Sequence, residues 1–159
     1  MSTFTHTFKN LLAENNYIYN HIETGCVMSP SIVVSKIDVS VVLEISDSDA
    51  RNAISALGKV VRLSDSLDVN SVAYETDENL ALPILEKIKT DAMERFRLSD
   101  VNIVQRVGKI PLGEYSHIVA VWARRVDDAF SACKFILEEM NSELPMWKYE
   151  VKGDSTEAA

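Results

Sequence analysis

Residues 101–123 read VNIVQRVGKIPLGEYSHIVAVWA, two apolar runs on either side of a short connecting stretch. The runs at 101–107 and 117–123 are predicted to be strands, because both are rich in the β-branched residues that sheets favour. Ile110-Pro111-Leu112-Gly113 is predicted to join them, since proline and glycine interrupt regular structure. The second half of the chain is therefore expected to contain two sequential strands.

A helix and one more strand are predicted after this pair. Asp127 is expected to cap the start of the helix, and Pro145 is expected to end it. Residues 146–151 are predicted to form a last short strand, and 153–159 a frayed polar tail. The helix would present one apolar face, made of Ala129, Cys133, Ile136, Leu137 and Met140.

Upstream of residue 101 the pattern is less regular. Residues 37–45 carry apolar side chains at every odd position, which predicts a strand. Further strands are predicted at 53–62 and 69–75. Helices are predicted at 4–22 and, with Pro83 in its first turn, over a segment whose apolar face carries Leu85, Ile88, Ala92 and Phe96.

Strands and helices in this irregular order indicate an α+β protein rather than a regularly wound parallel sheet. With 159 residues the chain is long enough for one domain and a modest appendage. We expect an N-terminal helical extension at 1–30, a folded domain at 31–152 and the tail at 153–159.

The charge balance narrows the class of partner. Acidic residues outnumber basic ones 24 to 16, for a net charge of −8, which disfavours binding to nucleic acid or to an anionic membrane. The first 94 residues hold 7 basic and 14 acidic residues, whereas residues 95–152 hold 9 basic and 8 acidic. A site for an anionic small molecule is therefore expected in the second half.

Cysteine and histidine usage gives no indication of a metal site or a disulfide framework. Cys26 and Cys133 are too few for such a framework, and neither they nor His6, His21 and His117 show metal-ligand spacing. His117 lies inside a strand pattern and is predicted to be structural. No basic leader precedes an apolar core, and no apolar run approaches the ~20 residues that span a bilayer. A cytoplasmic protein without a metal or cofactor is expected.

Two features could carry chemistry. Arg124-Arg125 stands where a strand gives way to a helix, and guanidinium groups at a helix start can bind phosphate; a solvated pair that balances Asp127 and Asp128 is the alternative. Lys148 follows Trp147, and like charge and burial would lower a lysine pKa enough to make it a base or nucleophile. The alternative is a surface lysine whose stem covers the ring.

Three segments resemble the large subunit of molybdopterin synthase. Residues 105–114 are similar to that family's histidine-arginine-x-glycine segment, residues 125–133 to its helix start, and residues 144–150 to its proline-x-tryptophan-lysine-x-glutamate signature. Tyr74-Glu75 and the helix after it also fit. The resemblance runs from about residue 49 to residue 150.

The resemblance implies an α/β hammerhead fold that forms a homodimer. It implies that a small ubiquitin-like carrier protein, ending in Gly-Gly, brings sulfur as a C-terminal thiocarboxylate. Two sulfur atoms would pass to cyclic pyranopterin monophosphate in molybdenum cofactor biosynthesis, and no metal is needed for this step. Lys148 would do the lysine chemistry, and Arg124, Arg125 and Arg62 would hold the anionic phosphate.

The site residues depart from the family pattern in several places. Asn141 stands where the family has a central lysine, and an amide cannot form an imine or act as a cation. Arg124-Arg125 replaces a histidine-arginine pair, and Gln105 replaces a histidine. Arg62 lies one residue beyond the family's arginine, and in a strand one step reverses the direction of a side chain.

Three hypotheses follow. The chain is an active sulfur-transferring subunit that uses Lys148, or it is a catalytically inactive homologue, a pseudoenzyme that keeps the dimeric fold as a protein-binding or regulatory module. A third is a relative with a different sulfur acceptor. Whether the chain is an enzyme stays open at this point.

Overall fold

The computed structural model describes residues 30–44 and 50–153, which form three helices and two sheets. The predicted helix at 4–22, the extension at 1–30 except its last residue, and the tail at 153–159 except its first residue lie outside these residues. The elements, in chain order, are β1 (Ser31–Val33), α3 (Val39–Glu44), β2 (Asn52–Lys59), β3 (Val69–Thr76), α4 (Glu78–Arg95), β4 (Leu98–Arg106), β5 (Gly108–Pro111), β6 (Tyr115–Ala123), α5 (Val126–Glu143) and β7 (Met146–Lys152).

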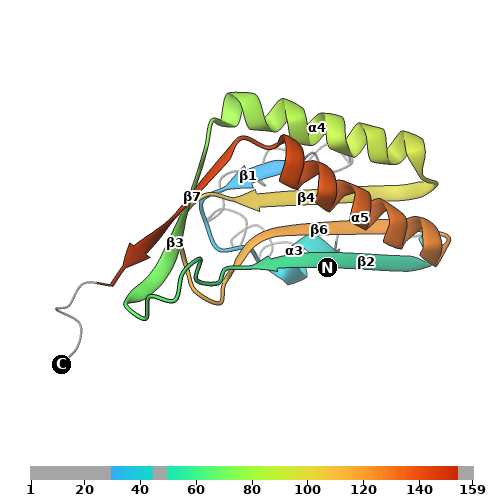
Figure 1. Ribbon diagram of the computed structural model, residues 1–159. Helices are drawn as coiled ribbons and strands as arrows, with labels where there is room; N and C mark the ends of the chain where they lie inside the picture. The colour runs from blue at the N-terminus through green and yellow to red at the C-terminus, as the bar shows by residue number, and fades with distance from the viewer. Residues whose placement is uncertain (1–29, 45–49, 154–159) are drawn as a thin grey trace, which may run out of the picture.

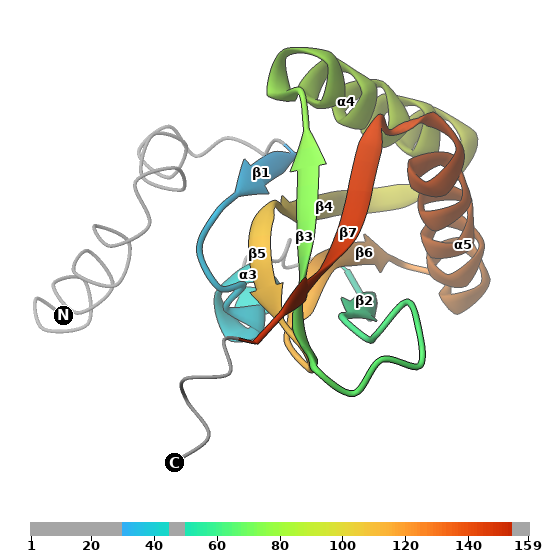
Figure 2. The same ribbon diagram turned by 60° about the vertical axis from the view of Figure 1, so that its left-hand side comes forward.

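The larger sheet has the strand order β1-β4-β6-β2. The strands β4 and β6 are antiparallel, as are β6 and β2, while β1 lies parallel to β4. The smaller sheet has the order β5-β3-β7 and is antiparallel throughout. Figure 1 shows α4 and α5 over one face of the larger sheet, and Figure 2 shows β3, β5 and β7 crossing its end.

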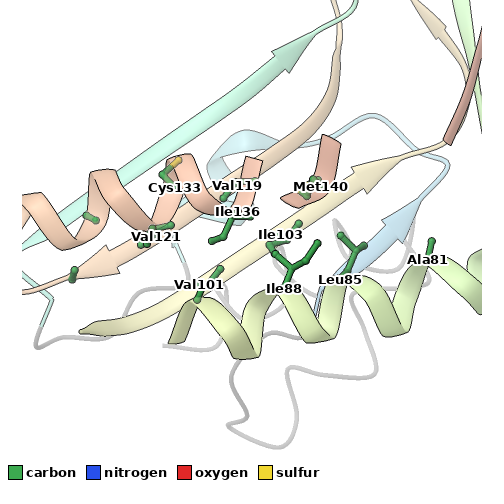
Figure 3. Close-up of a cluster of buried hydrophobic side chains, with 14 of the residues drawn as sticks. Ala81, Leu85, Ile88, Val101, Ile103, Val119, Val121, Cys133, Ile136 and Met140 are labelled. Carbon is green, nitrogen blue, oxygen red and sulfur yellow. The ribbon is translucent and has the colours of Figure 1, made fainter. Parts of the chain in front are cut away.

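The main core lies between these two helices and the larger sheet (Figure 3). Alternate residues of β4 and β6, such as Val101 and Val121, point into it because side chains on one face of a strand recur every two residues. From the helices, Leu85 and Ile136 are fully buried there. A second cluster on the opposite face includes Trp122, next to α3.

The predicted strands at 101–107 and 117–123 are confirmed as β4 and β6. The connection between them is longer than a turn, because β5 at Gly108–Pro111 pairs with β3 in the smaller sheet. The strands at 69–75 and 146–151 are confirmed as β3 and β7, whereas the strand predicted at 53–62 ends at Lys59.

The strand predicted at 37–45 is wrong, because Val39–Glu44 form α3. The carboxylate of Asp38 accepts hydrogen bonds from the Ser40 backbone N (3.0 Å) and the Ser40 hydroxyl (2.6 Å). A carboxylate in this position satisfies an N–H group that the first turn of a helix leaves unpaired. The local cap therefore prevails over the apolar alternation.

Two helix starts also differ from the prediction. Helix α5 begins at Val126, so its N-cap is Arg125 and not Asp127. Asp127 lies in the first turn instead, where the positive end of the helix dipole favours a carboxylate. Helix α4 begins at Glu78 after the cap residue Asp77, which places Pro83 in the second turn rather than the first.

Candidate active site

A cavity of about 250 Å³ lies between the C-terminal end of α5 and the ends of both sheets. Both apolar and polar side chains line it, with polar groups contributed by β3, β4, β6, α5 and β7. The lining residues are Tyr74, Gln105, His117, Leu137, Met140, Asn141, Leu144, Met146 and Lys148. The chain therefore brings an amine, an amide and an imidazole to one cavity.

Lys148 reaches this cavity from β7. It is paired with Tyr74 on β3, and its Nζ lies 5.3 Å from the centroid of the Tyr74 ring. This is a cation–π distance, so the ring helps to hold the ammonium in place. The lysine side chain is exposed, which puts its charge at the mouth of the cavity.

Asn141 lies in the last turn of α5 and lines the same cavity. No basic residue is present in this last turn, although the negative end of a helix dipole favours a cation there. The carboxamide of Asn141 leaves Lys148 as the one cationic side chain on the cavity lining. Lys148 and Asn141, which the sequence analysis selected as site candidates, thus line the same cavity.

His117 is the site residue that the sequence did not reveal. It was predicted to be a structural strand residue, yet it lines the cavity from β6. Its pairing partners are Gln105 on β4 and Gly58 on β2. Burial lowers the pKa of the imidazole, and the positive charge of Lys148 lowers it further.

Arg124 and Arg125 lie far from these groups. They are exposed at the junction of β6 and α5, and Asn52 Nδ2 donates to the Arg124 carbonyl (2.9 Å). Sixteen residues of helix separate Arg125 from Asn141, about 24 Å along the helix axis. Within one chain, the arginine pair and Asn141 therefore lie at opposite ends of α5.

Arg62 lines a separate, open hollow of about 500 Å³ together with Lys59 and Gly113. It follows β2, in a loop that is fastened to β7. The Glu150 carboxylate accepts hydrogen bonds from the backbone N of Leu63 (2.6 Å) and Ser64 (2.7 Å) and from the Ser64 hydroxyl. These bonds hold the pKa of Glu150 below its usual value.

Cys26, His6 and His21 lie outside the described residues. Among the described residues, no group of three His, Cys, Asp or Glu side chains could hold a metal ion. Cys133 is buried in the main core, as predicted, and burial raises the pKa of its thiol. None of the described helices is both long and apolar enough to cross a membrane.

These features define an α+β protein with a cavity between two sheets that bears one lysine amine. The chain belongs to the MoaE protein family, whose family model matches residues 32–143. This match confirms the predicted family.

Several relatives are proteins named molybdopterin synthase catalytic subunit. The one from Pyrococcus abyssi is 33% identical over 110 residues, which cover 69% of this chain and 74% of the relative. The one from Emericella nidulans is 35% identical over 94 residues, and the matched part spans only about half of it, 48%.

Solved structures share the fold. Molybdopterin synthase from Staphylococcus aureus superposes with a TM-score of 0.71 at 21% identity, covering 78% of this chain and 91% of that one. A protein–protein complex of subunits 1 and 2 of molybdopterin-converting factor from Helicobacter pylori gives a TM-score of 0.68 at 15% identity, covering 79% and 86%. The predicted α+β fold of this family is confirmed.

Proposed function

We propose that this chain is the large, catalytic subunit of a molybdopterin synthase. It would take sulfur from the thiocarboxylated C-terminus of a small ubiquitin-like carrier and transfer it to cyclic pyranopterin monophosphate. The observation that carries the proposal is the position of Lys148, whose amine stands at the mouth of a cavity in a member of the MoaE family. The reaction would take place in the cytoplasm.

The cavity suits the two reactants that this function requires. The last two residues of a carrier tail that ends in Gly-Gly have no side chains, so this end can enter a narrow opening in an extended form. The ammonium of Lys148 offers three N–H donors to a phosphate or to an oxygen on which negative charge develops. The apolar lining from Leu137 and Met140 can pack against the flat faces of a pterin.

The phosphate site is proposed to involve a second copy of the chain. Arg124 and Arg125 cannot reach the cavity of their own chain, because about 24 Å of helix separates them from Asn141. In a homodimer the arginine pair of one copy would approach the cavity of the other and bind the anionic pterin phosphate. Lys59 at the end of β2, and Arg62 in the loop that Glu150 fastens to β7, would add positive charge.

The test is a single-turnover reaction. Purified chain is mixed with a thiocarboxylated carrier ending in Gly-Gly and with cyclic pyranopterin monophosphate, and dithiolene formation is followed over time. We expect product in proportion to the carrier supplied, and no product with the same carrier ending in an ordinary carboxylate. Absence of product above background would contradict the proposed function.

Asn141 favours a second candidate, an inactive homologue that keeps the fold as a protein-binding module. The Asn141 side chain is an uncharged amide without a titratable amine. The last turn of α5, which carries it, contains no basic residue. This candidate predicts tight binding of the carrier by the wild-type chain without sulfur transfer. Recovery of transfer in Asn141→Lys would then show that the rest of the cavity is still competent.

A further inference from the structure

We propose that His117 Nε2 is the proton acceptor of the cavity, and that it takes a proton from the water that releases the carrier after sulfur transfer. The inference deepens the proposed function and rests on it. It is carried by the way three strands hold the imidazole and by the tautomer that its hydrogen bond selects.

The imidazole lies on the same face of β6 as Val119 and Val121, and a β-bulge comes directly beside it. Gly58 pairs with His117, but the next residue of β2, Lys59, pairs with Tyr115, so that Ser116 is left without a partner on β2. Bulges of this kind change the direction of a side chain and occur often beside active sites. The extra residue brings the Ser116 hydroxyl and the His117 ring together.

Gly58 provides the space for the ring. A Cβ atom added to Gly58 would lie 2.7 Å from His117 Nε2 and closer still to other ring atoms. Such contacts are too short for any side chain, so a glycine is required opposite this imidazole. The ring is therefore seated directly over the backbone of β2.

The hydrogen bonds of Ser116 determine the tautomer. Its hydroxyl donates to the Gly58 carbonyl (3.2 Å), which can only accept, and its oxygen lies 3.1 Å from His117 Nδ1. A hydroxyl has one proton, so the contact with Nδ1 must be one in which the ring donates. We infer from this arrangement that the neutral ring carries its proton on Nδ1 and that Nε2 keeps a lone pair.

Gln105 holds the bulge in place from the other side. Its amide nitrogen donates to the carbonyls of Arg106 and Ser116, both at 3.0 Å. Both amide protons are used in these bonds, so Gln105 acts as a positioning residue for Ser116. Among the described residues, Nε2 of His117 has no protein hydrogen-bond partner, which leaves it available to whatever the cavity contains.

The electrostatic surroundings keep this base unprotonated. Lys148 on β7 and Tyr74 on β3 are the titratable side chains that line the cavity with it. Burial and the charge of Lys148 both lower the pKa of His117, so the ring is neutral near pH 7. A neutral imidazole with a free lone pair is suited to act as a general base.

Release of the carrier is a hydrolysis of the bond between its carboxyl carbon and the sulfur. After the sulfur has bonded to the pterin, a water oxygen attacks the carboxyl carbon of the carrier, and one water proton passes to Nε2. The carbon–sulfur bond to the carrier breaks, and its electron pair stays on the sulfur. The carrier leaves as a carboxylic acid and the pterin keeps a thiolate, which neutralises when the imidazolium returns its proton.

The first experiment uses the full chain alone. Nitrogen-15 NMR of the histidine rings, with the His117 signals assigned through His117→Gln, reports the tautomer and the pKa. We expect the Nδ1–H form, a pKa below the usual value of about 6.5, and an upward shift of that pKa in Lys148→Gln. An Nε2–H tautomer, or a pKa at or above the usual value, would overturn the inference whatever the chain catalyses.

The second experiment measures, in a single turnover and as a function of pH, the rate at which the carrier is released with a C-terminal carboxylate. We expect His117→Gln to lower the rate about 100-fold or more and to remove the fall of the rate at acid pH, because a carboxamide cannot accept the proton. Tyr115→Phe, on the same strand, is the matched control and should keep both rate and profile. Unchanged rate and profile in His117→Gln would overturn the step and leave the proposed function intact; an inactive wild type would contradict both.

Discussion

The two ends of helix α5 differ in what they offer to an anionic substrate. At its start, Arg124 and Arg125 are exposed beside the acidic first turn that contains Asp127. At its end, Asn141 and Lys148 line a cavity together with His117. The first end carries two exposed cations, and the second lines a cavity with a single cation. Within one chain, the arginine pair expected to bind phosphate therefore lies about 24 Å along α5 from Asn141 and its cavity.

The largest effect is expected at the cavity. Lys148→Ala should lower the single-turnover rate of sulfur transfer about 100-fold or more, because it removes the one ammonium that can act on the reacting groups. Lys152→Ala is the matched control, a lysine on the same strand that pairs with Asp68 (3.0 Å) outside the cavity. Equal rates in the two variants would show that Lys148 takes no part in the reaction.

The next effect concerns the arginine end. Arg124→Ala combined with Arg125→Ala should raise the KM for the pterin phosphate about tenfold or more, since charge-assisted hydrogen bonds are lost. In a homodimer with shared sites, an equal mixture of this double variant with Lys148→Ala should regain about a quarter of wild-type activity after subunit exchange. Activity no higher than the sum of the separate variants would place the arginines outside the reaction.

A smaller effect is expected from adding charge to the cavity. Asn141→Lys should speed sulfur transfer about threefold to tenfold, because a second cation lies favourably at a helix C-terminus and near the phosphate. Ser142→Lys, the adjacent exposed position that does not line the cavity, is the control. A rate unchanged in Asn141→Lys and matched by Ser142→Lys would show that the cavity does not respond to charge at this position.

The smallest effect is on stability. The folded-state pKa of His117 is lowered, so below about pH 6.5 the unfolded chain binds more protons than the folded chain. The free energy of unfolding should therefore decrease as the pH falls through this range, and His117→Gln should make the decrease shallower. Urea unfolding at several pH values measures both. An equal slope in the two proteins would mean that His117 is not shielded from protons.

Much of the fold could be predicted from local patterns. The strands β4 and β6 were evident because their runs are long and rich in β-branched residues. Residues 37–45 misled because a short helix with a polar cap at Asp38 also carries apolar residues at alternate positions. The N-cap of α5 was misplaced because Asp127 is as well suited to the first turn as to the cap.

Only part of the candidate site could be predicted from the sequence. Lys148 and Asn141 stood in a recognisable signature, and the structure places them on one cavity. His117 could not be recognised, because its surroundings depend on strand register. Gly58 and Gln105 flank it from two other strands, and it shares a face of β6 with Val119 and Val121. The wide separation of the arginines from Lys148 likewise follows from the length of α5, not from any motif.

The most direct test of the cavity as the reaction site is to observe His117 while the pterin binds. Cyclic pyranopterin monophosphate is titrated into the wild-type chain, and the His117 ring signals are followed by NMR alongside the measured affinity. We predict that these signals shift in step with saturation and that Lys148→Gln weakens binding. Saturable binding that leaves the His117 signals unmoved and is insensitive to Lys148→Gln would contradict the account.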